Sequence, residues 1–257
     1  MFRGFYTLTS DMLTQQRRLN IISNNMANVS TPGFKKDTLM TTTFDERLAI
    51  RTGSVDKSSR VPLSDGNNVA MIRAGDEKIT NYEQGNMDVT GRPLDIAIIG
   101  DGFFAIQTPS SGVLYTRNGN FTLDEEGYLY LQHIGRVLGD DGEPILLGTD
   151  KVEFKYDGAI TYTEDQSRLG RVGVVNFIDY SQLEKTGEGM FQNLNGANVE
   201  QMELPDVRWK MLERSNASAM DEVVAMITSQ RALQSASQVL KMYDLIMSKA
   251  ANEIARI

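Results

Sequence analysis

Residues that are mostly apolar recur at alternating intervals of three and four along both ends of this chain. Near the start, the repeat runs through Met1, Phe5, Leu8, Met12, Gln15, Leu19, Ile22 and Met26. Near the end, it runs through Met226, Ser229, Leu233, Ala236, Leu240, Tyr243, Met247, Ala250, Ile254 and Ile257. A spacing of about 3.5 residues is the period at which a helix lays one narrow stripe against a partner helix. We therefore expect two long terminal helices that pack as a coiled coil.

These two stripes, here called the seams, are the expected assembly interface. The residues on which we place it are Phe5, Leu8, Met12, Leu19, Ile22 and Met26 in the first helix, and Met226, Leu233, Leu240, Tyr243, Met247 and Ile254 in the last. For an isolated helix, seam burial and the loss of backbone entropy nearly cancel, so we expect the ends to become ordered by packing. The partner is the other end of the chain or a neighbouring subunit. The alternative is that both helices pack only on the chain's own β domain.

The sequence indicates where each terminal helix begins and ends. The first is expected over about 3–27, because a polar stretch ending in Pro32 and Gly33 follows it and favours a turn. We expect Asn28, Thr31, Pro32 and Gly33 to form the corner at which the chain leaves the helix for the β region. The last helix is expected to begin near Ser215 or Ser218 and to continue to the end, since it contains neither glycine nor proline.

Between the helices, the apolar period changes to two and glycine turns become frequent. Strands are expected around Leu94–Ile98 and Phe103–Gln107, joined by a tight hairpin at Gly100–Gly102. Asn118-Gly119 predicts a second hairpin, because this pair accepts the positive φ angles of a type I′ turn. Further turns are expected at 124–127, 140–143 and 157–158. Short strands of this kind predict an antiparallel sandwich or a partly open barrel.

The expected fold class is therefore α+β, mainly β with long terminal helices. Residues 1–30 and 212–257 are expected to form the helical coiled-coil domain, and residues 82–180 the antiparallel β domain. Residues 31–81 and 181–211 are expected to be extended linkers. Within the first linker, 38–44 is Thr-rich and β-like, whereas 51–60 has the composition of a loop.

Composition argues against several kinds of chemistry. The net charge is −8, and basic residues form no run interleaved with aromatics, so a nucleic-acid partner is not expected. The absence of cysteine excludes disulfides and thiol catalysis, and the single histidine, His133, is expected at a strand rim. No segment has the roughly 20 apolar residues needed to insert in a membrane, and no cleavable secretory signal is expected. We expect no cofactor, metal or small-molecule substrate.

Several segments resemble the bacterial flagellar rod and hook protein family. IISNNMANVSTPGFKK, at 21–36, is similar to the signature that ends the first helix in this family. RPLDIAIIGDGFFAIQT at 92–108 and YTRNGNFTLDEEGYL at 115–129 resemble its central blocks. The segment 212–244 is similar to its closing helix. The resemblance covers both ends and most of the middle in the same order, and it leaves the proximal-rod and distal-rod subtypes both open.

This resemblance implies a structural subunit of the axial rod of the flagellar basal body. Such subunits leave the cell through the flagellar type III export apparatus and stack helically with themselves and with other rod and hook subunits. The rod is hollow and carries torque from the motor to the hook. The resemblance does not settle the subunit number, the helical symmetry, the axial neighbours or the type of cell envelope.

Functions of other classes remain as alternatives at this point. One is a cell-wall-acting enzyme resembling a glycan hydrolase, whose paired carboxylates would converge within about 5–10 Å in a pocket. Another is a carbohydrate-binding β module with helical anchors. Gly100–Ala105 matches the dinucleotide-binding pattern, but a strand rather than a helix is expected after it. The acidic turns at 124–126 and 140–143 lack the spacing of a calcium-binding loop.

Overall fold

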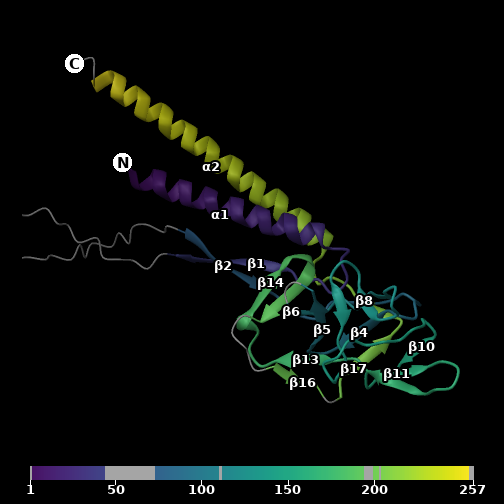
Figure 1. Cartoon of the computed structure of the whole chain (residues 1–257). Helices are drawn as coiled ribbons and strands as arrows, with labels where there is room; N and C mark the ends of the chain where they lie inside the picture. The colour runs from purple at the N-terminus through teal and green to yellow at the C-terminus, as the bar shows by residue number, and fades with distance from the viewer. Residues whose placement is uncertain (1, 44–72, 110–111, 194–198, 203, 255–257) are drawn as a thin grey trace, which may run out of the picture. The chain divides into compact units, whose positions relative to one another are not determined.

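The computed structural model describes residues 2–43, 73–109, 112–193, 199–202 and 204–254 (Figure 1). In the sequence, one long helix lies at each end of this part of the chain and a series of short strands lies between them. The pairings between these strands are all antiparallel. The expected α+β class is thus confirmed. The loop expected at 51–60 lies outside the described residues.

The chain divides into two compact units, which we call the helical unit and the β unit. The helical unit comprises 1–25, 37–80 and 220–257, and the β unit comprises 26–36 and 81–219. The segment Met26–Lys36 therefore belongs to the β unit, although the residues before it and after it in the sequence belong to the helical unit.

The helical unit contains both long helices and one ribbon of two strands. α1 spans Phe2–Ala27, close to the expected limits, and α2 spans Ala219–Ile254, directly after Ser218. Its 36 residues make α2 about 54 Å long at 1.5 Å per residue. Asp221 and Glu222 lie in its first turn, where the helix dipole favours negative charge. β1 (Asp37–Thr43) pairs with β2 (Arg73–Thr80), with an irregular register at Met40/Thr41.

The remaining strands all lie in the β unit. They are β3 Met87–Val89, β4 Ile96–Ile99, β5 Phe103–Thr108, β6 Gly112–Thr116, β7 Phe121–Leu123, β8 Leu129–Leu131, β9 Gly135–Val137, β10 Val152–Phe154, β11 Ala159–Tyr162, β12 Arg168–Arg171, β13 Val174–Phe177, β14 Leu183–Thr186, β15 Met190–Asn193, β16 Val199–Gln201, β17 Asp206–Trp209 and β18 Met211–Glu213. Two short 3-10 helices, Tyr180–Gln182 and Gly187–Gly189, flank β14. The stretch 181–211, expected as an extended linker, thus contributes β14 to β17.

The strands form one large sheet and three small ones. The large sheet runs β14-β15-β6-β5-β9-β8-β7, with β13 and β16 attached beside β5. β10, β11 and β12 form a second sheet, and the pairs β17-β4 and β18-β3 are separate. The last two pairs join the end of the β unit to its beginning. This closure brings residues near 213 beside residues near 85.

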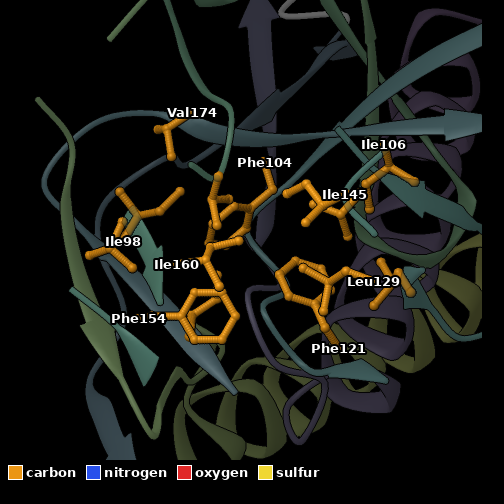
Figure 2. Packing of buried hydrophobic residues seen from close by; sticks show 14 of the residues in the cluster. Ile98, Phe104, Ile106, Phe121, Leu129, Ile145, Phe154, Ile160 and Val174 are labelled. Atoms are coloured by element: carbon orange, nitrogen blue, oxygen red, sulfur yellow. The ribbon is translucent and has the colours of Figure 1, made fainter. Parts of the chain in front are cut away.

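The larger of two apolar clusters in the β unit brings several sheets together. Figure 2 shows side chains from several sheets converging, among them Phe104 of β5, Phe121 of β7 and Ile160 of β11. These three are fully buried. Phe104 and Phe121 meet edge-to-face with ring centroids 5.2 Å apart, an arrangement that aromatic pairs prefer. A smaller aromatic cluster around Phe103 and Phe191 packs beside Tyr82 and Tyr180.

Some of the expected turns are confirmed and two expected hairpins are wrong. Gly127, Gly142 and Gly158 all have positive φ at the expected turns. However, β4 and β5 do not pair with each other, and neither do β6 and β7. At Gly119 a Cβ would lie 1.6 Å from the Ile96 carbonyl oxygen. Glycine is needed here because two backbones approach closely; the φ angle of Gly119 is not positive. Asn118 instead accepts the Asn120 N–H at 3.0 Å in a local turn.

His133 is exposed and has a φ of 65° between β8 and β9, so the expected rim position is confirmed. Among the helices that the structure describes, none is long and apolar enough to cross a membrane.

Candidate functional site

The corner after α1 is held by hydrogen bonds within itself. The Thr31 hydroxyl donates to the Asn28 side-chain carbonyl at 3.2 Å, and the Thr31 N–H donates to the Asn28 backbone carbonyl at 3.2 Å. Pro32 follows, with no N–H that would need a partner. The four residues singled out from the sequence, Asn28, Thr31, Pro32 and Gly33, therefore make a turn in the structure.

Gly33 fastens this corner to the rest of the β unit. Its φ is +67°, and its N–H donates to the Glu213 carbonyl at 2.7 Å. A Cβ at this position would lie 2.3 Å from the backbone carbonyl carbon of Arg117, a distance that no real Cβ contact tolerates. Position 33 therefore requires glycine for two reasons, its left-handed backbone and the close passage of the Arg117 backbone.

Three ionisable side chains form a buried charge cluster beside Gly33: Lys35, Glu213 and Arg117. The Lys35 ammonium lies 2.6 Å from Glu213 Oε1, and Arg117 Nη1 lies 3.5 Å from Glu213 Oε2. Each side chain is at most 3% exposed. Residues of these types are almost never fully buried unless they are paired, so the mutual pairing accounts for the burial of this cluster.

Further hydrogen bonds join the cluster to two other stretches of backbone. Lys35 Nζ also donates to the Glu83 carbonyl at 2.8 Å, and Glu213 Oε1 also accepts the Gly85 N–H at 2.9 Å. Arg117 Nη2 donates to the Gly100 carbonyl at 2.7 Å. The Arg117 guanidinium lies 5.2 Å from the Phe103 ring centroid, a cation–π distance. The cluster thus fixes the corner to the start, the middle and the end of the β unit.

Burial and ion pairing shift the pKa values of the two cations, Lys35 and Arg117, in opposite directions. Burial lowers the pKa of the Lys35 ammonium, and the Glu213 carboxylate beside it opposes that shift. The same two causes act on Arg117, whose pKa is also lowered, first by burial. One carboxylate faces two cations, so Glu213 is the group whose loss would leave the most uncompensated charge in the interior.

The backbone on either side of Lys35 is also engaged. The Phe34 ring is buried, and Lys185 Nζ lies 3.8 Å from its centroid and donates to the Lys35 carbonyl at 2.6 Å. Asn216 accepts the Lys36 N–H at 2.7 Å and donates to the Asn81 carbonyl at 2.8 Å. Asn216 therefore joins three stretches that are distant in the sequence.

Asn25 plays a similar part within the helical unit. It is buried near the end of α1, donates to the Asp37 carbonyl at 2.9 Å and accepts the Asp37 N–H at 3.0 Å. It also lies 3.5 Å from Glu222 Oε2 of α2. The Asp37 carboxylate accepts the Thr80 hydroxyl at 2.7 Å. One network of side chains thus connects α1, β1, β2 and α2.

The seams lie on the less exposed side of each helix in the single chain. Ile22 is buried, and the half-buried seam residues are Phe5, Leu8, Met12, Leu19, Met26, Met226, Leu233, Leu240, Tyr243 and Met247. Ser229 and Ala236, on the same stripe of α2, are buried. The side chain of Ile254 lies outside the described part. That the seams form the assembly interface stays a prediction.

A second apolar stripe on α2 was missed from the sequence. Its residues, which we call the outer face, are Met220, Val223, Val224, Ile227, Val239, Met242, Leu245 and Ile246, and they are 42–77% exposed. At about 100° per residue they lie opposite the seam of α2. The signal was present as a second set of three- and four-residue intervals. It was hidden because Arg231, Gln234 and Gln238 interrupt it.

Acidic side chains at two places in the described β unit lie beside basic partners. One hollow of about 430 Å³ is lined by Thr149, Lys151, Tyr162, Glu164 and Asp165, and Lys151 pairs with Glu164 at 3.0 Å. The acidic turn at 124–126 is paired with Arg136, which lies 2.8 Å from both Asp124 and Glu126. The described residues hold no group of three or more side chains suited to a metal ion.

Comparison with known proteins identifies the family. The family model for flagella basal body rod proteins matches residues 5–35, and the model for the C-terminal region of flagellar basal-body rod FlgEFG proteins matches 210–253. Between them, the D1-domain model of the flagellar hook protein FlgE/F/G matches 97–162. Flagellar basal-body rod protein FlgG of Bacillus subtilis (strain 168) is 32% identical over 98% of this chain and 99% of its own length. The chain belongs to the flagellar basal-body rod protein family.

Relatives of two rod types match this rod-family chain equally. Flagellar basal-body rod protein FlgF of Caulobacter vibrioides is 32% identical over 100% of the chain and 98% of its own length. FlgG of Borreliella burgdorferi is 29% identical over 98% of both. The family resemblance inferred from the sequence is confirmed. The matched segments include the corner and the residue that anchors it, Glu213.

The role of Gly33 in this rod-family fold can be measured directly. We expect Gly33→Ala to lower the free energy of unfolding of the β unit by roughly 2–4 kcal/mol, since it combines a strained φ with a backbone clash. Denaturant unfolding followed by the fluorescence of Trp209, the only tryptophan of the chain, measures this loss.

Gly91→Ala is the matched control. Gly91 has a φ of +72°, but a Cβ there would meet nothing within 4 Å. This variant isolates the backbone cost, about 1–2 kcal/mol. Equal losses in the two variants would show that the Arg117 backbone does not constrain position 33.

Proposed function

We propose that this chain is a structural subunit of the bacterial flagellar basal-body rod. The observation that carries the proposal is similarity along essentially the whole chain to proteins named basal-body rod proteins. The subunit would stack with copies of itself and with other rod and hook subunits, and would transmit torque along the hollow axial rod to the hook. Its route to that place would be the flagellar type III export apparatus.

We further propose that α1 and α2 pair along their seams as an antiparallel coiled coil. Two observations support the pairing. The seam side of each helix is the less exposed side, and Asn25 near the end of α1 bonds Glu222 near the start of α2. Because the end of α1 lies beside the start of α2, pairing would align the two seams along the length of both helices.

Copies of this chain are the proposed partners of the outer face. Pairing along the seams would leave this face in water, and eight partly exposed apolar side chains on one helix are costly to leave there. Burying them would contribute on the order of 10 kcal/mol before association costs. The seam would thus organise each subunit, and the outer face would hold subunits together.

The buried charge cluster would serve the mechanical role. A subunit of a shaft that carries torque needs a rigid β unit. Glu213 holds the corner in two ways: its backbone carbonyl accepts the Gly33 N–H, and its carboxylate pairs with the Lys35 ammonium. Family membership gives the enzyme alternative no support, because this is a family of structural proteins.

The seam can be tested with Leu19→Asp and Leu240→Asp. Either variant should abolish rod assembly and swimming in cells that lack their own copy, because a charge would be buried in helix pairing. The β unit should unfold at the same denaturant concentration as in the wild type. Complementation of motility and the fluorescence of Trp209 measure the two effects.

Gln230→Asp supplies the control, since Gln230 is exposed on the side of α2 between the seam and the outer face. It should leave swimming intact. Normal motility with aspartate at Leu19 and at Leu240 would rule the seams out as an assembly element.

A further inference from the structure

Two of the four methionines of α2 lie on its outer face. Met220 is 77% exposed and Met242 is 58% exposed. Met226 and Met247 lie on the seam side and are half-buried, and Met190 in the β unit is 2% exposed. The chain has no cysteine, so methionine supplies all of its sulfur. The thioethers that an oxidant can reach most easily are thus among those that the proposed assembly would cover.

We propose that Met220 and Met242 are oxidation sites through which peroxides block self-association. The proposal rests on the proposed function, in which the outer face packs against a second copy. In the reaction, the thioether sulfur attacks one oxygen of hydrogen peroxide, the O–O bond breaks and an S–O bond forms. Sulfur loses two electrons, the peroxide gains them, and water leaves. The product is methionine sulfoxide.

The chemistry of the product explains the block. A thioether is apolar and adaptable, whereas a sulfoxide is a strong hydrogen-bond acceptor. Met220 lies one turn from Val223 and Val224, and Met242 lies one turn from Leu245 and Ile246. On a face that packs against another apolar helix, the sulfoxide oxygen would have no donor. We expect each buried sulfoxide to weaken association by about tenfold.

The position of the two residues predicts selective oxidation. In the free chain, Met242 should be oxidised faster than Met247, five residues along the same helix. Met190 should be oxidised last, because it is buried among the strands. Assembly should protect Met220 and Met242 while Met40, which is 51% exposed on β1, serves as an internal reference. Peptide mapping by mass spectrometry after brief exposure to hydrogen peroxide measures these rates.

Sedimentation velocity at rising concentration tests the consequence for the full-length chain. Peroxide should raise the concentration at which the wild type associates by at least about tenfold. The double variant Met220→Leu and Met242→Leu keeps a similar volume and apolar character, so it should associate like the wild type and resist peroxide. Met40→Leu, the matched control, should remain sensitive.

Unchanged association of the oxidised wild type would overturn this proposal alone, and so would equal sensitivity of the double leucine variant. Those outcomes leave the proposed function standing. A wild-type chain that stays monomeric at every concentration, alone and with other rod subunits, would overturn both.

Discussion

Aspartate at both Val224 and Met242 should abolish rod formation and leave the free subunit as stable as the wild type. Both side chains are 58% exposed, so in the single chain a carboxylate at either position stays in water and costs little. In the assembled rod the same carboxylates would be buried against apolar residues of a neighbour without a cation. An unpaired buried charge is strongly destabilising, and two of them should stop assembly completely.

The measurement is complementation of swimming, together with electron microscopy of isolated basal bodies. Circular dichroism of the purified chain checks that α2 is still helical. Gln230→Asp again supplies the matched charge on a neighbouring side of the helix. Complete rods built from the double aspartate variant would show that the outer face does not pack against other subunits.

Replacing Glu213 with alanine should lower the free energy of unfolding of the β unit by about 3–5 kcal/mol. The carboxylate is the one anion between Lys35 and Arg117 in the buried charge cluster, and its loss leaves two buried cations facing each other. The Gly85 N–H loses its acceptor as well. Denaturant unfolding followed by Trp209 fluorescence measures the change, and swimming should fall with it.

A double variant separates loss of charge from loss of packing. Lys35→Met together with Glu213→Leu removes one cation and the anion while keeping apolar volume, and should be less destabilising than Glu213→Ala alone. A wild-type midpoint for Glu213→Ala would contradict the anchoring role of the cluster.

The terminal helices could be predicted because their signals are local. The extent of α1 is set by nearby residues: a long apolar repeat favours the helix, and Pro32 and Gly33 soon after it favour its end. The turns at Gly127, Gly142 and Gly158 were predictable for the same reason, since each needs a positive φ. Asn118-Gly119 carries the same local signal, but its glycine serves the approach of the Ile96 backbone from about twenty residues away. Local reasoning cannot separate these two uses of glycine.

The anchor could be predicted only in part. The corner residues were visible from the turn pattern, yet nothing in Phe34-Lys35-Lys36 tells the buried lysine from its half-buried neighbour. The burial of Lys35 depends on Glu213, 178 residues along the chain, and on Arg117. The outer face of α2 could not be predicted as readily, because Arg231, Gln234 and Gln238 interrupt its apolar repeat.

Burial of the outer face on assembly is tested most directly by chemical accessibility. The chain has no cysteine, so Ile246→Cys places one thiol on this face, where the native side chain is 63% exposed. We expect a maleimide to label this thiol rapidly in the free subunit and not in isolated rods. Equally rapid labelling in free subunits and in intact rods would contradict the proposal that α2 joins neighbouring subunits through its outer face.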